Sequence, residues 1–183
     1  MLAKACRRLT PIALLLLSSG MAAEARSVGP TDGFEHGNRG QWTATGAASL
    51  RQAPSAGQPG FAPHSGKNFV LLSNQLPFPA AALTTTVTIE AAKGAPCTLD
   101  LWVHAPGKSG AVVLSVQEGF ATGPKLAERR IPAPVVSTRK YATAHVLQRL
   151  NFAHPGTPLF VMIAAAGPIE AAIDDFALRC RAN

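Results

Sequence analysis

The stretch that decides the fold is Cys97-Thr98-Leu99-Asp100-Leu101-Trp102-Val103-His104. Every second residue of it is aliphatic or cysteine, and such a period of two is typical of a β-strand with one buried face. Residues 97, 99, 101 and 103 are expected to face a core, and the residues between them the opposite side. Turn-forming residues follow at positions 106–110, and the alternation resumes with Val112, Leu114 and Val116. The pattern predicts a hairpin formed by these two strands.

The same period continues on either side of this predicted hairpin. Residues 83–89 alternate apolar and hydroxyl side chains, which predicts a further half-buried strand. Additional strands are expected at residues 42–46, 67–72, 141–147, 159–164 and 172–180. Connections rich in Pro and Gly are expected at residues 53–66, 104–110 and 119–134. The strongest helix candidate, residues 142–150, fits neither the helical nor the strand period. The chain is therefore predicted to be an all-β, antiparallel β-sandwich.

The composition excludes several classes of protein. The chain has 183 residues, about the size of a single domain. It contains 16 Gly and 15 Pro, too many for a helical bundle or a coiled coil. The formal net charge is +7, with the densest basic points at Arg129-Arg130 and Arg139-Lys140. Apart from Tyr141, no aromatic ring lies between these points, so we expect no nucleic-acid partner.

Residues 1–25 have the organisation of a secretory signal peptide. A basic segment at residues 4–8 precedes the apolar run 12–17, and Ala23-Glu24-Ala25 supplies a cleavage site of the A-x-A type. The apolar run is too short to span a membrane. We therefore expect a mature domain of residues 26–183 that is exported to the periplasm or secreted, with no transmembrane segment.

Two cysteines, Cys97 and Cys180, lie beyond the expected signal peptide. An even pair in an oxidising compartment favours a disulfide bond, which would tie the last strand to a central one. The alternative is a pair of free thiols in a metal site or a nucleophilic site, although neither cysteine has a CxxC partner.

Three further stretches carry a resemblance to a known family. The chain has Asp32-Gly33-Phe34-Glu35-His36-Gly37 followed by Gly40-Gln41-Trp42, then His64-Ser65-Gly66-Lys67-Asn68, and finally Ile173-Asp174-Asp175-Phe176-Ala177-Leu178. In order and spacing, these motifs resemble those of the jelly-roll, galactose-binding-like domains that include many carbohydrate-binding modules. The resemblance covers residues 32–179 and implies a jelly-roll β-sandwich. It also implies noncovalent binding of a glycan or a cell-envelope polysaccharide. Trp42, in the G-x-W motif, is expected to be a core ring.

In that family a structural calcium ion often joins the start of the domain to its end. The positions that match here are Glu35, the backbone around Lys67, and Asp174 or Asp175. Calcium takes carboxylate and carbonyl oxygens as ligands, so the resemblance implies a calcium site at these residues. The alternative is that one of the two adjacent aspartates faces solvent while the other caps a loop or pairs with an arginine.

The outward side of the strand 97–104 is the candidate surface for sugar contacts. Asp100, Trp102 and His104 share this side, and Gln117 is expected on the neighbouring strand. A half-exposed ring among polar groups is suited to sugar binding. If Trp102 instead covers the second sheet or lies under a loop, the domain would be a structural or protein-interaction module of the envelope, with an exposed aliphatic patch.

No motif in the sequence indicates catalysis. The five histidines are scattered singly, and neither an HExxH nor a GxSxG motif occurs. We therefore expect a binding module rather than an enzyme. A small hydrolase or lyase would need two converged acids, or a His–acid pair in a cleft.

Overall fold

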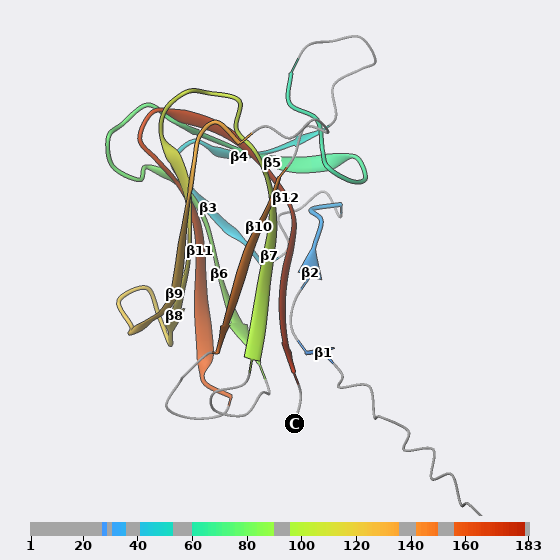
Figure 1. Cartoon of the computed structure of the whole chain (residues 1–183), viewed down its shortest axis with the longest axis vertical. Helices are drawn as coiled ribbons and strands as arrows, with labels where there is room; N and C mark the ends of the chain where they lie inside the picture. The colour runs from blue at the N-terminus through green and yellow to red at the C-terminus, as the bar shows by residue number, and fades with distance from the viewer. Residues whose placement is uncertain are drawn as a thin grey trace, which may run out of the picture.

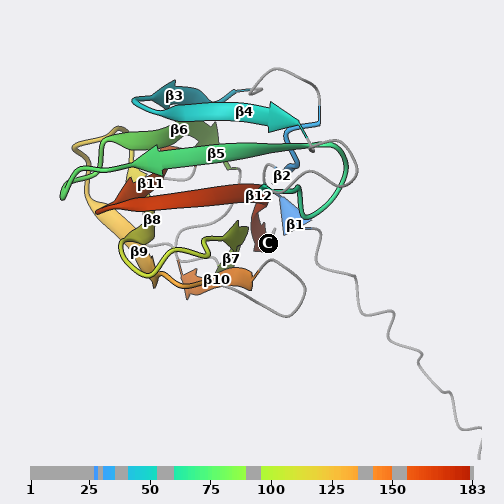
Figure 2. The same ribbon diagram turned by 90° about the horizontal axis from the view of Figure 1, so that it is seen from above.

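The computed structural model describes residues 27–28, 31–35, 41–52, 60–89, 96–135, 142–149 and 156–181. Its strands form two antiparallel sheets that pack face to face (Figures 1 and 2). The expected all-β sandwich is confirmed, and the part of the chain that is described contains no helix. The expected signal peptide, residues 1–25, lies outside the described residues.

The first sheet has seven strands. Its main path runs β10 (Ala142–Arg149), β7 (Pro96–His104), β12 (Ile169–Arg181), β5 (Asn68–Asn74) and β4 (Ala48–Gln52). Two short strands, β1 (Ser27–Val28) and β2 (Thr31–Asp32), also pair with β12. The second sheet has five strands, in the order β3 (Thr43–Thr45), β6 (Ala81–Thr88), β11 (Pro158–Ala166), β8 (Ala111–Glu118) and β9 (Lys125–Pro132).

The alternation predicted for β7 is confirmed residue by residue. Cys97, Leu99, Leu101 and Val103 are buried, while the residues between them are partly exposed. This strand has neighbours on both sides, β10 and β12, so its inward face packs against the core and its outward face meets solvent or loops.

The predicted hairpin is wrong. The strands β7 and β8 belong to different sheets, so residues 105–110 carry the chain from one sheet to the other. As a consequence, Gln117 of β8 lies in the second sheet and is not on a strand that neighbours β7. The sequence also failed to predict β9, which lies within the expected connection 119–134. The strand expected at residues 141–147 is confirmed as β10, so the helix candidate 142–150 is a strand.

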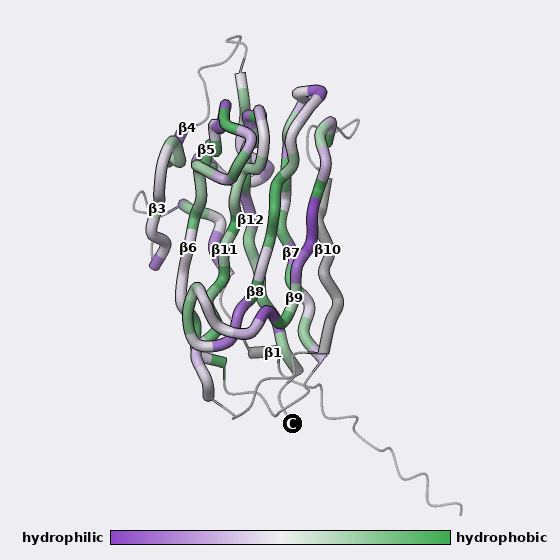
Figure 3. Tube along the Cα trace, turned by 90° about the vertical axis from the view of Figure 1, so that its left-hand side faces the viewer, coloured by the Kyte–Doolittle hydropathy of each residue, from purple (hydrophilic) through white to green (hydrophobic). Residues whose placement is uncertain are grey.

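The core lies between the two sheets and includes a cluster of aromatic rings. Trp42, as expected, is buried at 5% exposure and packs edge-on against Phe176, with ring centroids 4.9 Å apart. Phe34 also lies near the same indole, with ring centroids 6.3 Å apart. Figure 3 shows hydrophobic residues along the central strands and hydrophilic ones along β9, at the edge of the second sheet.

A disulfide bond joins Cys97 of β7 to Cys180 of β12. The two cysteines are direct partners in the pairing of these strands, and both are buried. The bond therefore ties the C-terminal strand to a central strand of the same sheet, as the sequence predicted.

Candidate functional site

A β-bulge in β12 organises the outer face of the first sheet. The pairing of β12 with β7 shifts register between Asp174 and Ala177, and Asp175 adopts a positive φ of 46°. Ile173 and Phe176 both face the core although three positions separate them, because the extra residue changes the phase of the strand. The bulge thus allows two adjacent acids within an otherwise apolar strand.

Asp174 turns its carboxylate to the backbone of the loop that precedes β5. Its Oδ2 accepts hydrogen bonds from the N–H groups of His64 and Ser65, at 2.8 and 3.1 Å, and its Oδ1 accepts one from Asp175 at 2.8 Å. The side chain is fully buried, and this desolvation raises the pKa of Asp174 from 3.8 to about 6 in spite of the N–H donors. One aspartate of the pair therefore caps a loop, as the alternative to calcium predicted.

Asp175 holds the side chains of the same two loop residues. Its Oδ2 lies 2.6 Å from Nδ1 of His64, and its Oδ1 accepts a hydrogen bond of 2.8 Å from the hydroxyl of Ser65. The His64 ring is thereby placed flat on Trp102, with centroids 3.7 Å apart and an angle of 11° between the planes. A carboxylate on β12 thus fixes the ring that covers one face of the β7 indole. Trp102 therefore lies partly under a loop, the arrangement that the sequence analysis associated with an interaction module, but it keeps a half-exposed part.

Glu35 holds the other end of this loop. Both of its carboxylate oxygens accept the N–H of Lys67, at 2.9 and 3.0 Å, and Oε1 also accepts the N–H of Asn68 at 3.0 Å. The loop passes over the carboxylate at Gly66, where a Cβ would lie 2.2 Å from the carboxyl carbon of Glu35. We call residues 61–67 the clasp, because these carboxylates fasten them to the sheet and to the start of the domain.

The four residues expected to form a calcium site do lie around the clasp, but their present partners are hydrogen-bond donors. The carboxylates of Glu35 and Asp174 accept backbone N–H groups, and Lys67 contributes an N–H rather than an oxygen. Within the described ranges, no group of three or more His, Cys, Asp or Glu side chains is placed to hold a metal ion. Glu35, Asp174 and Asp175 supply carboxylate oxygens, the type of ligand that calcium takes, but in this structure these oxygens accept N–H and hydroxyl groups. Calcium binding stays a prediction.

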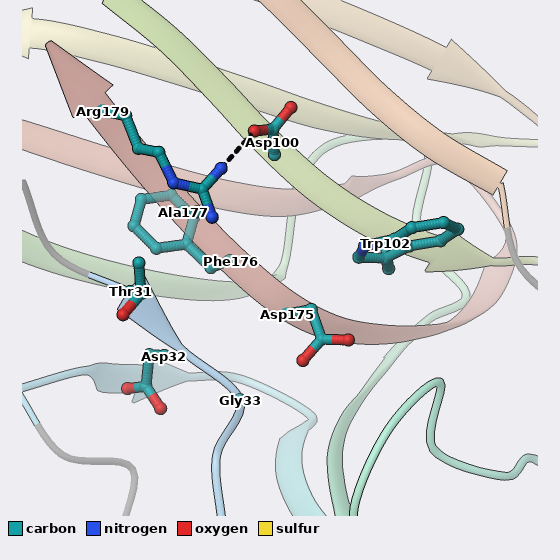
Figure 4. A pocket seen from close by; sticks show the side chains of 9 residues that line it. All are labelled: Thr31, Asp32, Gly33, Asp100, Trp102, Asp175, Phe176, Ala177 and Arg179. Carbon is teal, nitrogen blue, oxygen red and sulfur yellow. Dashed lines mark hydrogen bonds and ion pairs between the residues drawn. The ribbon is translucent and has the colours of Figure 1, made fainter. Parts of the chain in front are cut away.

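A pocket of about 610 Å³ opens beside the clasp, on the outer face of the first sheet (Figure 4). It lies between β2 on one side and β7 on the other, with the bulged part of β12 as its floor. The lining residues are Thr31, Asp32, Gly33, Asp100, Trp102, Asp175, Phe176, Ala177 and Arg179.

The charges of this pocket are held in place from different strands. Arg179 donates a hydrogen bond of 2.8 Å to Asp100 across the β12–β7 pair, and Figure 4 shows both side chains at one end of the pocket. Asp32 accepts the N–H of Phe34 at 2.7 Å, which fixes its carboxylate at the β2 side. Asp175 is held by the clasp. The lining therefore presents three oriented carboxylates and one guanidinium around a half-exposed indole.

The structure brings together part of the predicted sugar-contact patch. Asp100 and Trp102 line the pocket, while His104 lies farther along β7, against the ring of Phe61 at 5.6 Å. Gln117 belongs to the other sheet and is not part of this surface. Sequence reasoning missed Asp32 and Arg179 as pocket residues. The H-S-G motif signalled the position of the clasp, but not that His64 stacks on Trp102.

No family model matches the sequence, and no curated protein matches it significantly. Solved structures do match over most of the chain. The structure of TmCBM61 in complex with β-1,4-galactotriose has a TM-score of 0.53 and 19% identity, covering 80% of this chain and 92% of the other. The CBM22-1 xylan-binding domain of Paenibacillus barcinonensis Xyn10C has a TM-score of 0.56 and 13% identity, covering 88% of this chain and 99% of the other.

Not every match is a carbohydrate-binding module. A cyclase from Fischerella sp. TAU has a TM-score of 0.57 and 13% identity, covering 78% of this chain and 86% of the other. In the described part of the chain, no helix is long and apolar enough to cross a membrane. The architecture and these matches agree with the resemblance that the sequence motifs carry: the chain is a jelly-roll β-sandwich with the fold of carbohydrate-binding modules.

Proposed function

We propose that this domain binds a glycan, without altering it, in the pocket beside the clasp. The observation that carries the proposal is the composition of that pocket, in which the partly exposed ring of Trp102 lies among Asp32, Asp100, Asp175 and Arg179. Carboxylates and a guanidinium supply acceptors and donors for sugar hydroxyls, and the part of the indole that the His64 ring leaves uncovered supplies an apolar surface for the sugar ring. The volume of about 610 Å³ lies within the range of small-ligand pockets.

The preorganisation of the pocket supports the same function. Asp100 is paired with Arg179, and Asp175 with His64, so the polar groups already have fixed orientations without a ligand. Binding then loses little free energy in ordering side chains. The similarity of the fold to TmCBM61, solved in complex with β-1,4-galactotriose, and to a xylan-binding domain supports glycans as the class of ligand.

The proposal is tested by electrophoresis of the folded protein through native gels that contain β-1,4-galactan, xylan, β-glucan, mannan or soluble peptidoglycan fragments. We expect one of these polysaccharides to retard the protein, and Trp102→Ala or Arg179→Gln to abolish the retardation. Arg129→Gln is the matched control, because Arg129 is an exposed arginine on β9 of the other sheet. If no polysaccharide retards the folded protein, the proposal is wrong.

We further propose that the domain is not an enzyme. The pocket holds both arrangements that the sequence analysis required of a hydrolase: acids that share one cleft, Asp32, Asp100 and Asp175, and the pair of His64 and Asp175. Both side chains also have a structural task, since Asp175 holds Ser65 as well and the His64 ring covers Trp102. Prolonged incubation with the polysaccharide that retards the protein should release no reducing ends. Release that His64→Gln abolishes would identify an enzyme instead.

We also propose that the protein is exported from the cytoplasm. The buried disulfide between Cys97 and Cys180 is compatible with an oxidising compartment, and the n-region, apolar run and A-x-A site support a signal peptide at residues 1–25. The full-length chain expressed in a bacterium should be recovered from the periplasm or the medium with an N-terminus at Arg26. An uncleaved chain in the cytoplasm would contradict this part.

A further inference from the structure

The turn between β8 and β9, residues 119–124, presents an aromatic ring to solvent. Phe120 is 66% exposed, more than any other large hydrophobic side chain that the structure describes. The turn begins at the end of β8 where Glu118 pairs with Leu159, and Figure 1 shows it projecting from the sandwich, below the loops at the top of the view. A phenylalanine in this position leaves most of its apolar surface in water, so its burial in a contact would be favourable.

Backbone hydrogen bonds give this turn a fixed shape. The N–H of Gly123 donates to the carbonyl of Phe120 at 2.8 Å, and the N–H of Gly119 donates to the carbonyl of Pro158 at 2.7 Å, which ties the turn to β11. A Cβ on Gly123 would lie 1.8 Å from the carbonyl oxygen of Glu118, so only glycine lets the chain close this tightly. The ring of Phe120 is therefore carried on a rigid projection, and we call residues 119–124 the knob.

A pocket lies at the opposite end of β8. There Ala111 pairs with Ala166, and the connections 105–110 and 167–168 meet. The pocket between them has a volume of about 530 Å³, and we call it the socket. Its lining is largely apolar, with Glu170 as the charged member. The apolar side chains of the lining are Phe61, Pro106, Pro168 and Ile169.

The socket is also held in a fixed form. The hydroxyl of Ser109 donates a hydrogen bond of 3.0 Å to the carbonyl of Pro168, which joins the two connections. The amide of Asn74 donates one of 2.9 Å to the carbonyl of Phe78, and this closes the turn 75–80, whose first residue lines the pocket. Asn74 is only 3% exposed, so the turn cannot easily open. An apolar group entering the socket therefore meets walls that are already in place.

The knob and the socket of one chain cannot meet. The strand β8, with eight residues, separates them by about 25 Å. The ring of Phe120 can therefore reach a socket only on another copy of the chain. A contact between two different patches of the same molecule is heterologous, and repeating it builds a row of copies, or a ring if the rotation closes.

The charges around the two ends suit such a contact. Lys125 is exposed at the start of β9, next to the knob, and Glu170 is exposed in the socket. Glu118, at the base of the knob, has a counterpart in Lys108, which is exposed on the connection 105–110. Lys125 also pairs with Glu128 on its own strand, but such an exposed pair contributes little and can exchange partners. Each end thus offers a charge of the opposite sign to the other.

We propose that copies of this chain assemble head to tail, with the knob of one copy in the socket of the next. A contact centred on one ring is small, and small interfaces are weak, so the assembly is expected at high protein concentration. Neither Phe120 nor the socket belongs to the pocket beside the clasp, which stays open in the assembly. The inference is thus independent of glycan binding.

Two variants remove one half of the contact each. Phe120→Asp places a charge on the knob. Gly107→Phe fills the socket, because Gly107 lines it and an added Cβ there has nothing within 4 Å, so the fold should tolerate the new ring. Phe78→Ala is the matched control, because Phe78 is 59% exposed at the socket end but does not line the pocket. All three are first shown to unfold at the temperature of the parent.

Analytical ultracentrifugation between about 10 μM and about 1 mM protein, the range of weak contacts, measures the assembly. The average mass of the parent and of Phe78→Ala should rise with concentration beyond twice that of one chain. Phe120→Asp and Gly107→Phe should each keep the mass of one chain. An equimolar mixture of these two variants should associate again but stop at twice the mass of one chain, because one knob and one socket remain.

Three results would overturn the proposal. The first is a parent protein that keeps the mass of one chain at every concentration. The second is a mixture of Phe120→Asp and Gly107→Phe in which the two variants do not associate, since a heterologous contact requires that they do. The third is association that Phe78→Ala abolishes and Phe120→Asp leaves intact, which would identify the turn 75–80 as the contact instead.

Discussion

Replacing Gly66 with alanine should release the clasp from the start of the domain. Gly66 has a φ of +60°, and a Cβ there would lie 2.2 Å from the carboxyl carbon of Glu35. The Glu35 side chain is flexible and exposed, so it would swing away rather than block folding. In doing so it would lose its hydrogen bonds to the N–H groups of Lys67 and Asn68.

Two separate costs determine the size of the effect. A residue other than glycine in the left-handed region costs about 1–2 kcal/mol. The loss of one hydrogen bond to a charged acceptor costs about 1.5–3 kcal/mol. We count only the bond from Asn68, because Asn68 is buried, whereas water can replace Glu35 as the partner of the exposed Lys67 N–H. We therefore expect Gly66→Ala to lower the free energy of unfolding by about 2.5–5 kcal/mol.

Urea denaturation of the two variants Gly66→Ala and Gly156→Ala separates these costs. Gly156 has a φ of +76° and nothing within 4 Å of an added Cβ, so its variant carries the backbone cost alone. The difference between the two variants measures the contribution of Glu35. Equal losses of stability in the two variants would refute the role assigned to the clasp. In that case Glu35→Gln should also leave the free energy of unfolding unchanged.

Three further perturbations test other parts of the structure. Cys97→Ser/Cys180→Ser should lower the free energy of unfolding by about 4–5 kcal/mol, because the bond spans 83 positions of the chain and chain-entropy arguments assign that value to such a loop; an unchanged urea midpoint would contradict it. Burial raises the pKa of Asp174 to about 6 from 3.8, so the stability that this group contributes is complete below pH 3.8 and is lost as the pH rises through about 6. Asp174→Asn should remove that slope from a plot of unfolding free energy against pH, and an unaltered slope would speak against the assignment. Because the clasp carboxylates already accept N–H donors, EDTA should leave the melting temperature unchanged; a rise of the melting temperature on adding calcium would instead support the predicted calcium site.

The sequence predicted the central strands and the edge strands β3 and β10, but it missed the edge strands β4 and β9, and for β9 there is a physical reason. A strand such as β7 meets the core on one face and has neighbours on both sides, so it must alternate. The edge strand β9 has one neighbour in its sheet path, and Ala127 is its one buried residue. Such a strand tolerates the charged run of residues 128–130, which leaves no period of two to find.

The wrong hairpin has a different cause. Residues 105–110 contain turn-forming residues between two alternating strands, and this pattern is the same for a hairpin and for a connection that crosses between sheets. Only the pairing of β7 with β10 and β12 distinguishes them, and those partners are distant in sequence. Because β8 was expected to pair with β7, Gln117 was predicted on the outer face of the first sheet, whereas it lies in the second sheet.

The candidate site was predictable where sequence motifs carried it. The order of the motifs placed Glu35, the clasp and the Asp174-Asp175 pair near one another, as observed. The bulge that separates the two aspartates leaves no sequence signal beyond the change of phase between Ile173 and Phe176. Arg179 and Asp32 reach the pocket only because β2 and β7 flank the bulged part of β12, which is a property of the fold.

Tryptophan fluorescence tests the central claim, glycan binding beside Trp102, most directly. The chain contains two tryptophans, and Trp42 is buried in the core at 5% exposure, so a bound sugar should alter the emission of Trp102 alone. Titration with the polysaccharide that retards the protein should change the emission of the parent and of Trp42→Phe, with the same midpoint. Trp102→Phe should show no change in emission even where some binding persists. A sugar-dependent change that survives in Trp102→Phe, or its absence in a parent protein that binds the polysaccharide, would place the glycan elsewhere and contradict the account.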